Sequence, residues 1–187
     1  MENNKNILTT LIQKIKNLSQ KQKTLLLAID GRGGSGKSTL AEKLKQNLQD
    51  VTIVHLDDFA YPNTDRQRLL TQVILPLKEN KPAKYQRFDW GTKQLAEWHE
   101  IQPGGIVIIE GVSTLHDMLY KYFDFKIWIE CPAKVGFQRG VQRDKAVYHV
   151  DTTKDWLETW MPEEKKYIDE QHPQERADFI FDGSKQI

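Results

Sequence analysis

A glycine-rich segment near the start of the chain constrains its fold more than any other feature. The apolar run from Thr24 to Asp30 precedes this segment, and a helical pattern from Lys37 to about Leu48 follows it. A strand, a glycine loop and a helix in this order are the context in which the pattern G-x-x-x-x-G-K-[ST] binds phosphate. The segment is Gly31-Arg32-Gly33-Gly34-Ser35-Gly36-Lys37-Ser38-Thr39. It predicts a nucleotide-binding phosphate loop. The alternative is a glycine-rich turn without a ligand.

The residue types of this loop match the chemistry of a nucleoside triphosphate. Glycines let successive backbone N–H groups point inward at phosphate oxygens, and the following helix adds the positive end of its dipole. We expect Lys37 to reach the β- and γ-phosphates and the Ser38 hydroxyl to ligate magnesium. The predicted cofactors are ATP and Mg²⁺. The predicted nucleotide-binding residues are Gly31, Gly33, Gly34, Ser35, Gly36, Lys37, Ser38 and Thr39.

Apolar runs and helical patterns alternate along the rest of the chain, which predicts an α/β fold around a mainly parallel sheet with helices on both faces. Its length of 187 residues suits one domain, here 1–187, opened by an amphipathic helix within 1–22. The predicted strands are 24–30, 51–56, 106–110, 125–130 and 179–181, with helical patterns over 65–77, after 110, over 133–143 and over 154–171. Ligands of such sheets bind beyond the carboxyl ends of the strands.

Acidic residues stand at two of these strand ends. The second strand ends in Asp57 and Asp58, and the third ends in Glu110. Beside a phosphate loop, Asp57 is a candidate to accept the proton of an attacking hydroxyl or to help hold magnesium. An acid at the end of a buried strand beside a phosphate loop commonly helps to hold magnesium. We therefore expect Glu110 to contact the magnesium ion that Ser38 ligates. The alternatives are a turn or helix cap for the aspartates and a plain strand end for Glu110.

Two arginines, Arg139 and Arg143, lie four residues apart on a predicted helix and therefore share a face. A polar segment follows them, and we expect about 139–153 to form a small lid. Its two arginines would stabilise the transferring phosphoryl group. The alternative is a solvated helix face.

Composition narrows the partners and the compartment. The net charge of +1 gives no reason to expect nucleic acid or an anionic membrane as partner. Cys131 is the only cysteine, and it ends a predicted strand, so we expect a buried structural thiol and a reducing compartment. No signal peptide and no apolar run near 18 residues is visible. The sequence thus predicts a cytoplasmic protein.

Taken in order, these motifs resemble the uridine kinase family, whose relatives include pantothenate kinases and phosphoribulokinases. The resemblance spans about residues 24–183. Besides the phosphate loop, it rests on Asp57-Asp58-Phe59, Phe88-Asp89-Trp90, Ile109-Glu110-Gly111 and Arg139-x-x-x-Arg143-Asp144.

The resemblance implies a P-loop NTPase fold, a three-layer sandwich with a five-stranded parallel core and a lid. It implies that Mg-ATP is the phosphate donor, that Asp57 is the base facing the acceptor hydroxyl, and that Lys37, Arg139 and Arg143 complete the catalytic set. The expected acceptor site comprises Asp58, Tyr61, Tyr85, Phe88, Asp89 and Trp90.

Two departures from the family pattern fall on nucleoside contacts. Uridine kinases tend to have Tyr where this chain has Ala60, and they have His and Arg soon after the position of Trp90, where Gly91-Thr92-Lys93 stands here. We therefore expect a kinase for a hydroxyl of a small molecule, with a uridine- or cytidine-like nucleoside as the first candidate. A partner-stimulated ATPase or a regulatory nucleotide-binding protein is the alternative, although no Asn-Lys-x-Asp or Leu-Ser-Gly-Gly-Gln segment is present.

Overall fold

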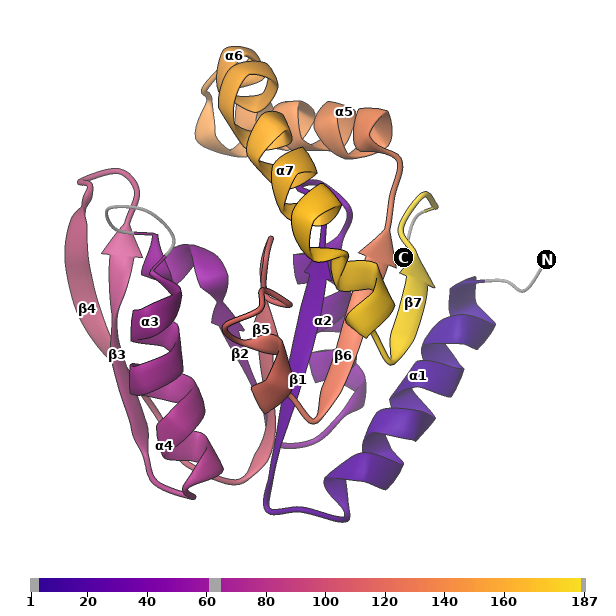
Figure 1. Ribbon diagram of the computed structural model, residues 1–187, viewed down its shortest axis with the longest axis vertical. Coiled ribbons are helices and arrows are strands. Elements are labelled where there is room, and N and C mark those ends of the chain that lie inside the picture. Colours follow the sequence, from indigo (N-terminus) through magenta and orange to yellow (C-terminus); the bar gives the residue numbers. More distant parts are fainter. Residues whose placement is uncertain (1–3, 61–64, 186–187) are drawn as a thin grey trace.

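A five-stranded sheet forms the centre of the computed structural model, which describes residues 4–60 and 65–185 (Figure 1). Its strand order is β2-β5-β1-β6-β7, and every neighbouring pair is parallel. The strands are β1 (Thr24–Gly31), β2 (Val51–His55), β5 (Gly105–Glu110), β6 (Phe125–Glu130) and β7 (Phe179–Asp182). All five correspond to predicted strands, and the predicted α/β fold is confirmed.

The central strand β1 is continuously apolar because both of its faces are covered. Leu25, Leu26, Leu27, Ala28 and Ile29 are fully buried, as expected for a parallel strand between two layers of helices. Its register with β5 ends at the pair Ile29–Glu110, and β2 ends opposite the same glutamate through His55. The carboxyl ends of β1, β2 and β5 therefore meet at one edge of the sheet.

Two helical layers cover the sheet, which confirms the three-layer arrangement. One face packs against α1 (Asn4–Ser19) and α2 (Lys37–Asn47) through a core that includes Leu11, Ile15, Leu40 and Leu44. The other face packs against the helical stretch of α3 (Arg66–Leu69), a π-helical turn (Leu70–Ile74) and α4 (Leu75–Lys78).

A two-stranded antiparallel hairpin lies beside α3 and α4 and was not among the predicted strands. Its strands are β3 (Ala83–Asp89), which carries the expected acceptor residues Tyr85, Phe88 and Asp89, and β4 (Gln94–Ile101). Most residues of β4 are exposed, so the strand has no apolar pattern of its own. It exists because β3 supplies its hydrogen bonds, with Tyr85 opposite His99.

The helical pattern expected directly after β5 was wrong. The chain forms turns there, and its one regular element before β6 is a short 3₁₀-helix (Tyr120–Tyr122). The reason lies in Asp30 at the end of β1, whose carboxylate accepts hydrogen bonds from the backbone N–H groups of Ser113 and Leu115 (3.0 and 2.7 Å). Donors tied to a buried carboxylate cannot serve a helix ladder.

A last helical layer lies beyond the carboxyl ends of the strands (Figure 1). It consists of α5 (Ala133–Arg143), a π-helical turn (Asp144–Tyr148), α6 (Thr153–Asp155), a second π-helical turn (Trp156–Trp160) and α7 (Met161–Gln171). The predicted helix over 154–171 is thus present. Cys131 is buried, as expected. Among the described residues, no helix is both long enough and apolar enough to cross a bilayer.

Candidate active site

The phosphate loop joins β1 to α2, and its backbone takes a form that only glycine adopts readily. Gly36 is the N-cap of α2 with φ 103°, and Gly34 has φ 67°. A Cβ atom on Gly34 would lie 2.1 Å from the carbonyl oxygen of Gly136 in α5. The loop therefore lies tightly under α5. Position 34 requires glycine, because its backbone has a positive φ and because no space remains for a side chain.

Polar groups inside this loop suit a bound polyphosphate. The buried Lys37 ammonium donates to the carbonyl oxygens of Gly31 and Arg32 (3.0 and 2.9 Å). The Ser35 hydroxyl is buried and has no hydrogen-bond partner among the described residues. A buried hydroxyl without a partner carries a free-energy cost that a ligand oxygen would remove. The loop thus has the donor set that phosphate oxygens require.

Ser38 and Glu110, both predicted to contact magnesium, lie in contact. The Ser38 hydroxyl donates to Oε1 of Glu110 at 3.0 Å, and Nδ1 of His55 lies 2.6 Å from the same oxygen. Burial would raise the pKa of Glu110, but the His55 hydrogen bond and the charge of Lys37 outweigh burial and hold the pKa below its usual value. The same hydrogen bond raises the pKa of His55. Glu110 is therefore an ionised, oriented carboxylate. His55 directly precedes the Leu56-Asp57-Asp58 segment, yet its residue type alone suggested no role.

Asp57 lies in a 3₁₀-helix (Leu56–Phe59) directly after β2. Asp57 is exposed to solvent, yet many protein atoms surround its carboxylate. This partial burial raises the pKa of Asp57, and the negative charge of Glu110 raises it further. No cluster of three His, Cys, Asp or Glu side chains ready to hold a metal occurs within 4–60 and 65–185. Mg²⁺ commonly takes one or two carboxylates and completes its shell with water and nucleotide phosphates. Ser38, Glu110 and Asp57 fit that chemistry, and their metal role remains a prediction.

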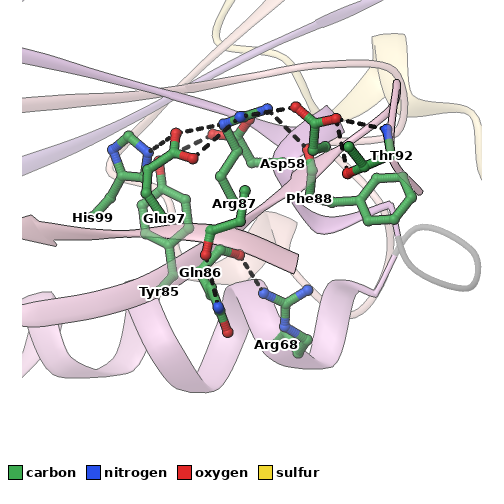
Figure 2. Close-up of polar contacts among 11 residues, drawn as sticks. Asp58, Arg68, Tyr85, Gln86, Arg87, Phe88, Thr92, Glu97 and His99 are labelled. Carbon is green, nitrogen blue, oxygen red and sulfur yellow. Dashed lines mark hydrogen bonds and ion pairs between the residues drawn. The ribbon is translucent and has the colours of Figure 1, made fainter. Parts of the chain in front are cut away.

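The predicted acceptor residues Asp58 and Tyr85 contact each other (Figure 2). The Tyr85 hydroxyl donates to Oδ2 of Asp58 at 3.0 Å, and the Tyr85 ring stacks on Phe59 and His99 with ring centroids 4.9 and 5.2 Å apart. Burial raises the pKa of Asp58 and, with the charge of Asp58, that of Tyr85. The hairpin is thus joined to the segment that carries Asp57.

The other predicted acceptor residues lie nearer the hairpin turn. Phe88 is buried and meets the ring of Trp90 edge-on, whereas Trp90 itself is 58% exposed. Oδ1 of Asp89 accepts from the backbone N–H and the hydroxyl of Thr92. Tyr61 lies outside the described residues. Figure 2 also shows a guanidinium that sequence reasoning missed: Arg87 donates to Glu97 (2.6 Å) on β4 and to Asp89 (3.1 Å).

The two lid arginines have different partners. Arg139 donates to the carbonyl oxygens of Gly183 and Ser184, just after β7 (2.6 and 2.9 Å). Arg143 pairs with Asp144, its neighbour in sequence (2.7 Å). In the described contacts neither arginine reaches Asp57, so their catalytic role and the lid itself remain predictions.

Two carboxylates around the loop had no predicted role. Asp30 is fully buried and accepts from the backbone N–H of Gly31 (2.7 Å) and from the Tyr167 hydroxyl (2.6 Å). Glu164 accepts from the backbone N–H of Gly33 at 2.6 Å. An acid that ends a buried strand directly before the loop is a signal that singles out Asp30. Glu164 lies 131 residues from its partner, and no local pattern marks it.

Comparison with known proteins assigns the chain to a family. The sequence model of the Phosphoribulokinase / Uridine kinase family matches residues 54–186, which contain both acidic strand ends and begin after the phosphate loop. This chain belongs to that family. The family resemblance drawn from the motifs is confirmed.

Curated relatives of this phosphoribulokinase / uridine kinase family member are distant. The uridine kinase of Borrelia turicatae is 26% identical in an alignment of 137 positions that covers 64% of this chain and 66% of that protein. The uridine kinase of Haemophilus ducreyi is 25% identical in an alignment of 151 positions that covers 67% of this chain and 69% of that protein.

Solved structures share the fold of this family member. A "possible uridine kinase" from Bacillus stearothermophilus superposes with a TM-score of 0.72 at 23% identity, covering 95% of this chain and 98% of that chain. The D-glycerate 3-kinase of Cryptococcus neoformans gives a TM-score of 0.56 at 15% identity, with 86% and 88% covered. The fold is thus common to proteins named for different acceptors.

Proposed function

We propose that this protein is an ATP- and magnesium-dependent kinase that transfers the γ-phosphate to a hydroxyl of a small molecule. The observation that carries the proposal is the meeting of the phosphate loop with two acidic strand ends. Ser38 of the loop contacts Glu110 at the end of β5, and the charge of Glu110 acts on Asp57, which follows β2. Phosphoryl transfer needs a phosphate cradle, a metal and a base for the acceptor at one place.

Each of these groups has a task under the proposal. The loop N–H groups and Lys37 bind and neutralise the phosphates, and Ser38 and Glu110 would hold Mg²⁺, which supplies charge stabilisation when bound. Asp57 orients the acceptor hydroxyl and accepts its proton; its raised pKa makes it a stronger base than an ordinary carboxylate. Arg139 and Arg143 would stabilise the transferring group from the lid and help to exclude water.

The acceptor site is proposed to lie between Asp57 and the β3–β4 hairpin. Asp58 and Tyr85 form a polar pair there, and the aromatic rings of Phe88 and Trp90 lie on the same hairpin. Aromatic faces and paired polar groups suit a ligand with a flat ring and hydroxyls. The curated relatives are named uridine kinases, so uridine and cytidine are the first acceptors to test.

We also propose a partner and a compartment for the protein. Its partner is a small-molecule acceptor rather than a nucleic acid or a membrane, in agreement with the net charge of +1. Its compartment is the cytoplasm, in agreement with its single, buried cysteine.

ATP consumption with Mg²⁺, measured against a panel of acceptors, tests the function. The panel contains uridine, cytidine, other nucleosides, pantothenate, nicotinamide riboside and simple sugars. Stimulation by uridine or cytidine supports the nucleoside reading, and stimulation by another member keeps the kinase and changes its acceptor. Steady hydrolysis that no acceptor stimulates would contradict the kinase and favour a partner-driven ATPase.

Asp57→Asn tests the assignment of the base. We expect turnover to fall at least a hundredfold, the scale of general-base catalysis, while ATP affinity changes less than threefold. Asp155→Asn, the same change on an exposed residue of α6, is the matched control. Full activity of Asp57→Asn would show that another group accepts the proton.

A further inference from the structure

A buried carboxylate of α7 occupies part of the phosphate loop. Glu164 is only 6% exposed, and its Oε1 accepts the hydrogen bond of the Gly33 backbone N–H at 2.6 Å. Its Oε2 lies 4.0 Å from the Arg32 guanidinium. Burial raises the pKa of Glu164, while the Gly33 N–H and the charges of Lys37 and Arg32 act to lower it. The Lys37 ammonium itself bonds to two backbone carbonyls of the loop. The carboxylate thus binds the loop as an anion would.

The packing around Gly33 holds this contact in place. A Cβ atom on Gly33 would lie 2.7 Å from Oε1 of Glu164 and 2.4 Å from the ring of Trp156. The Trp156 indole N–H in turn donates to Asp144 at 3.0 Å. The helical layer that follows β6 therefore presses directly on the loop, and Glu164 lies at the point of contact.

A second contact joins α7 to the beginning of the same loop. The Tyr167 hydroxyl, one turn after Glu164, donates to Asp30 at 2.6 Å, and Asp30 accepts from the backbone N–H of Gly31. One helix is therefore tied to the loop through Asp30 and through Gly33. Two ties on one helix fix the Glu164 carboxylate on the loop rather than leaving it to swing into solvent.

This placement sets Glu164 against the phosphates of a nucleotide. Phosphate oxygens bind to backbone N–H groups of such a loop, and charge-assisted hydrogen bonds of that kind are about twice as strong as neutral ones. The N–H of Gly33 is already used by a negative group. An incoming phosphate meets a donor that is engaged and a like charge that water screens poorly, because the carboxylate is buried.

We propose that Glu164 is a specificity-determining residue of the nucleotide site, where its carboxylate competes with the nucleotide phosphates for the loop. The inference rests on the proposed nucleotide binding. Since repulsion between like charges grows with the charge of the ligand, Glu164 lowers the affinity for ATP more than for ADP and leaves adenosine unaffected. Binding of ATP then requires the carboxylate to leave Gly33, which loosens α7 from the loop.

Titration calorimetry of Glu164→Gln with ATP, ADP and adenosine tests the competition. The substitution removes the negative charge, and the neutral amide oxygen of Gln accepts the hydrogen bond from Gly33 more weakly than a carboxylate does. We expect the Kd for ATP to fall at least threefold, the Kd for ADP to fall less, and that for adenosine to stay within twofold. Glu163→Gln is the matched control, because it removes the same charge from the exposed neighbour and leaves all three ligands within twofold of wild type.

The outcomes separate the inference from the proposed function. If wild type binds ATP and Glu164→Gln binds it equally or more weakly, the competition is refuted and the kinase proposal stands. An equal gain for ATP and adenosine also refutes the competition. If neither protein binds ATP, the proposed function fails and the inference fails with it. A melting curve without ligand checks folding. Should Glu164→Gln not fold, Glu164→Ala, which removes both the acceptor and the charge, must gain at least threefold for ATP or the inference is refuted.

Discussion

The close approach of α5 to the phosphate loop leads to a quantitative prediction for Gly34→Ala. Gly34 has φ 67°, and an added Cβ would lie 2.1 Å from the carbonyl oxygen of Gly136. The left-handed backbone costs an L-residue about 1–2 kcal/mol, and the overpacking costs about 1–3 kcal/mol because the obstacle is backbone. The stiffer unfolded chain returns about 0.4–1 kcal/mol. We expect the free energy of unfolding to fall by about 1–5 kcal/mol.

Denaturant unfolding, followed by circular dichroism, measures this loss, and thermal unfolding should show a midpoint about 2–20 °C lower. Gly91→Ala is the control, because its new Cβ would meet only the Asp89 carboxylate at 3.3 Å; we expect a change within about 0.5 kcal/mol. A loss below about 0.5 kcal/mol for Gly34→Ala would show that α5 does not press on the loop, and the argument for a tightly covered loop would be wrong.

Two further predictions concern Asp30 and Asp57. Tyr167→Phe keeps the ring but removes the hydroxyl that donates to Asp30, so the free energy of unfolding should fall by about 1–3 kcal/mol. Denaturant unfolding measures this change, and an unchanged value would show that the buried hydrogen bond contributes nothing to stability. If Asp57 is the base, it works only when ionised, and because its pKa is raised, kcat/KM should fall with decreasing pH around a midpoint above the ordinary value of about 3.9. A pH profile that stays flat down to about pH 4, on protein shown by circular dichroism to remain folded, would exclude Asp57 as the base.

The sheet and its edge were predictable because their signals are local. Each buried strand is a short apolar run, and the loop motif fixes the edge at which Asp57 and Glu110 meet. Strand β4 escaped prediction since its side chains face mostly solvent and its hydrogen bonds come from β3. The turns after β5 escaped because a carboxylate from another strand, that of Asp30, holds their backbone.

The phosphate-loop residues of the site could be predicted from the sequence, whereas the side chains that contact them from distant elements could not. Residue types in the loop imply their chemistry directly, whereas the bond between Glu164 and Gly33 joins positions 131 residues apart. The hydrogen bond between His55 and Glu110 likewise depends on the sheet register that places them opposite each other. Such pairings follow from tertiary structure, and a single sequence carries no pattern that marks them.

The strand order also determines when the protein can fold during synthesis. Strand β1 is made early, yet both of its neighbours, β5 and β6, come much later in the chain. The hydrogen bond between Thr24, which begins β1, and Gly104, which directly precedes β5, spans 80 residues, which a ribosome adds in about 4–16 s. Until then the most apolar strand has two unpaired edges. Such an early central strand with late neighbours gives a high contact order, slow folding and a nascent chain that depends on protection from aggregation.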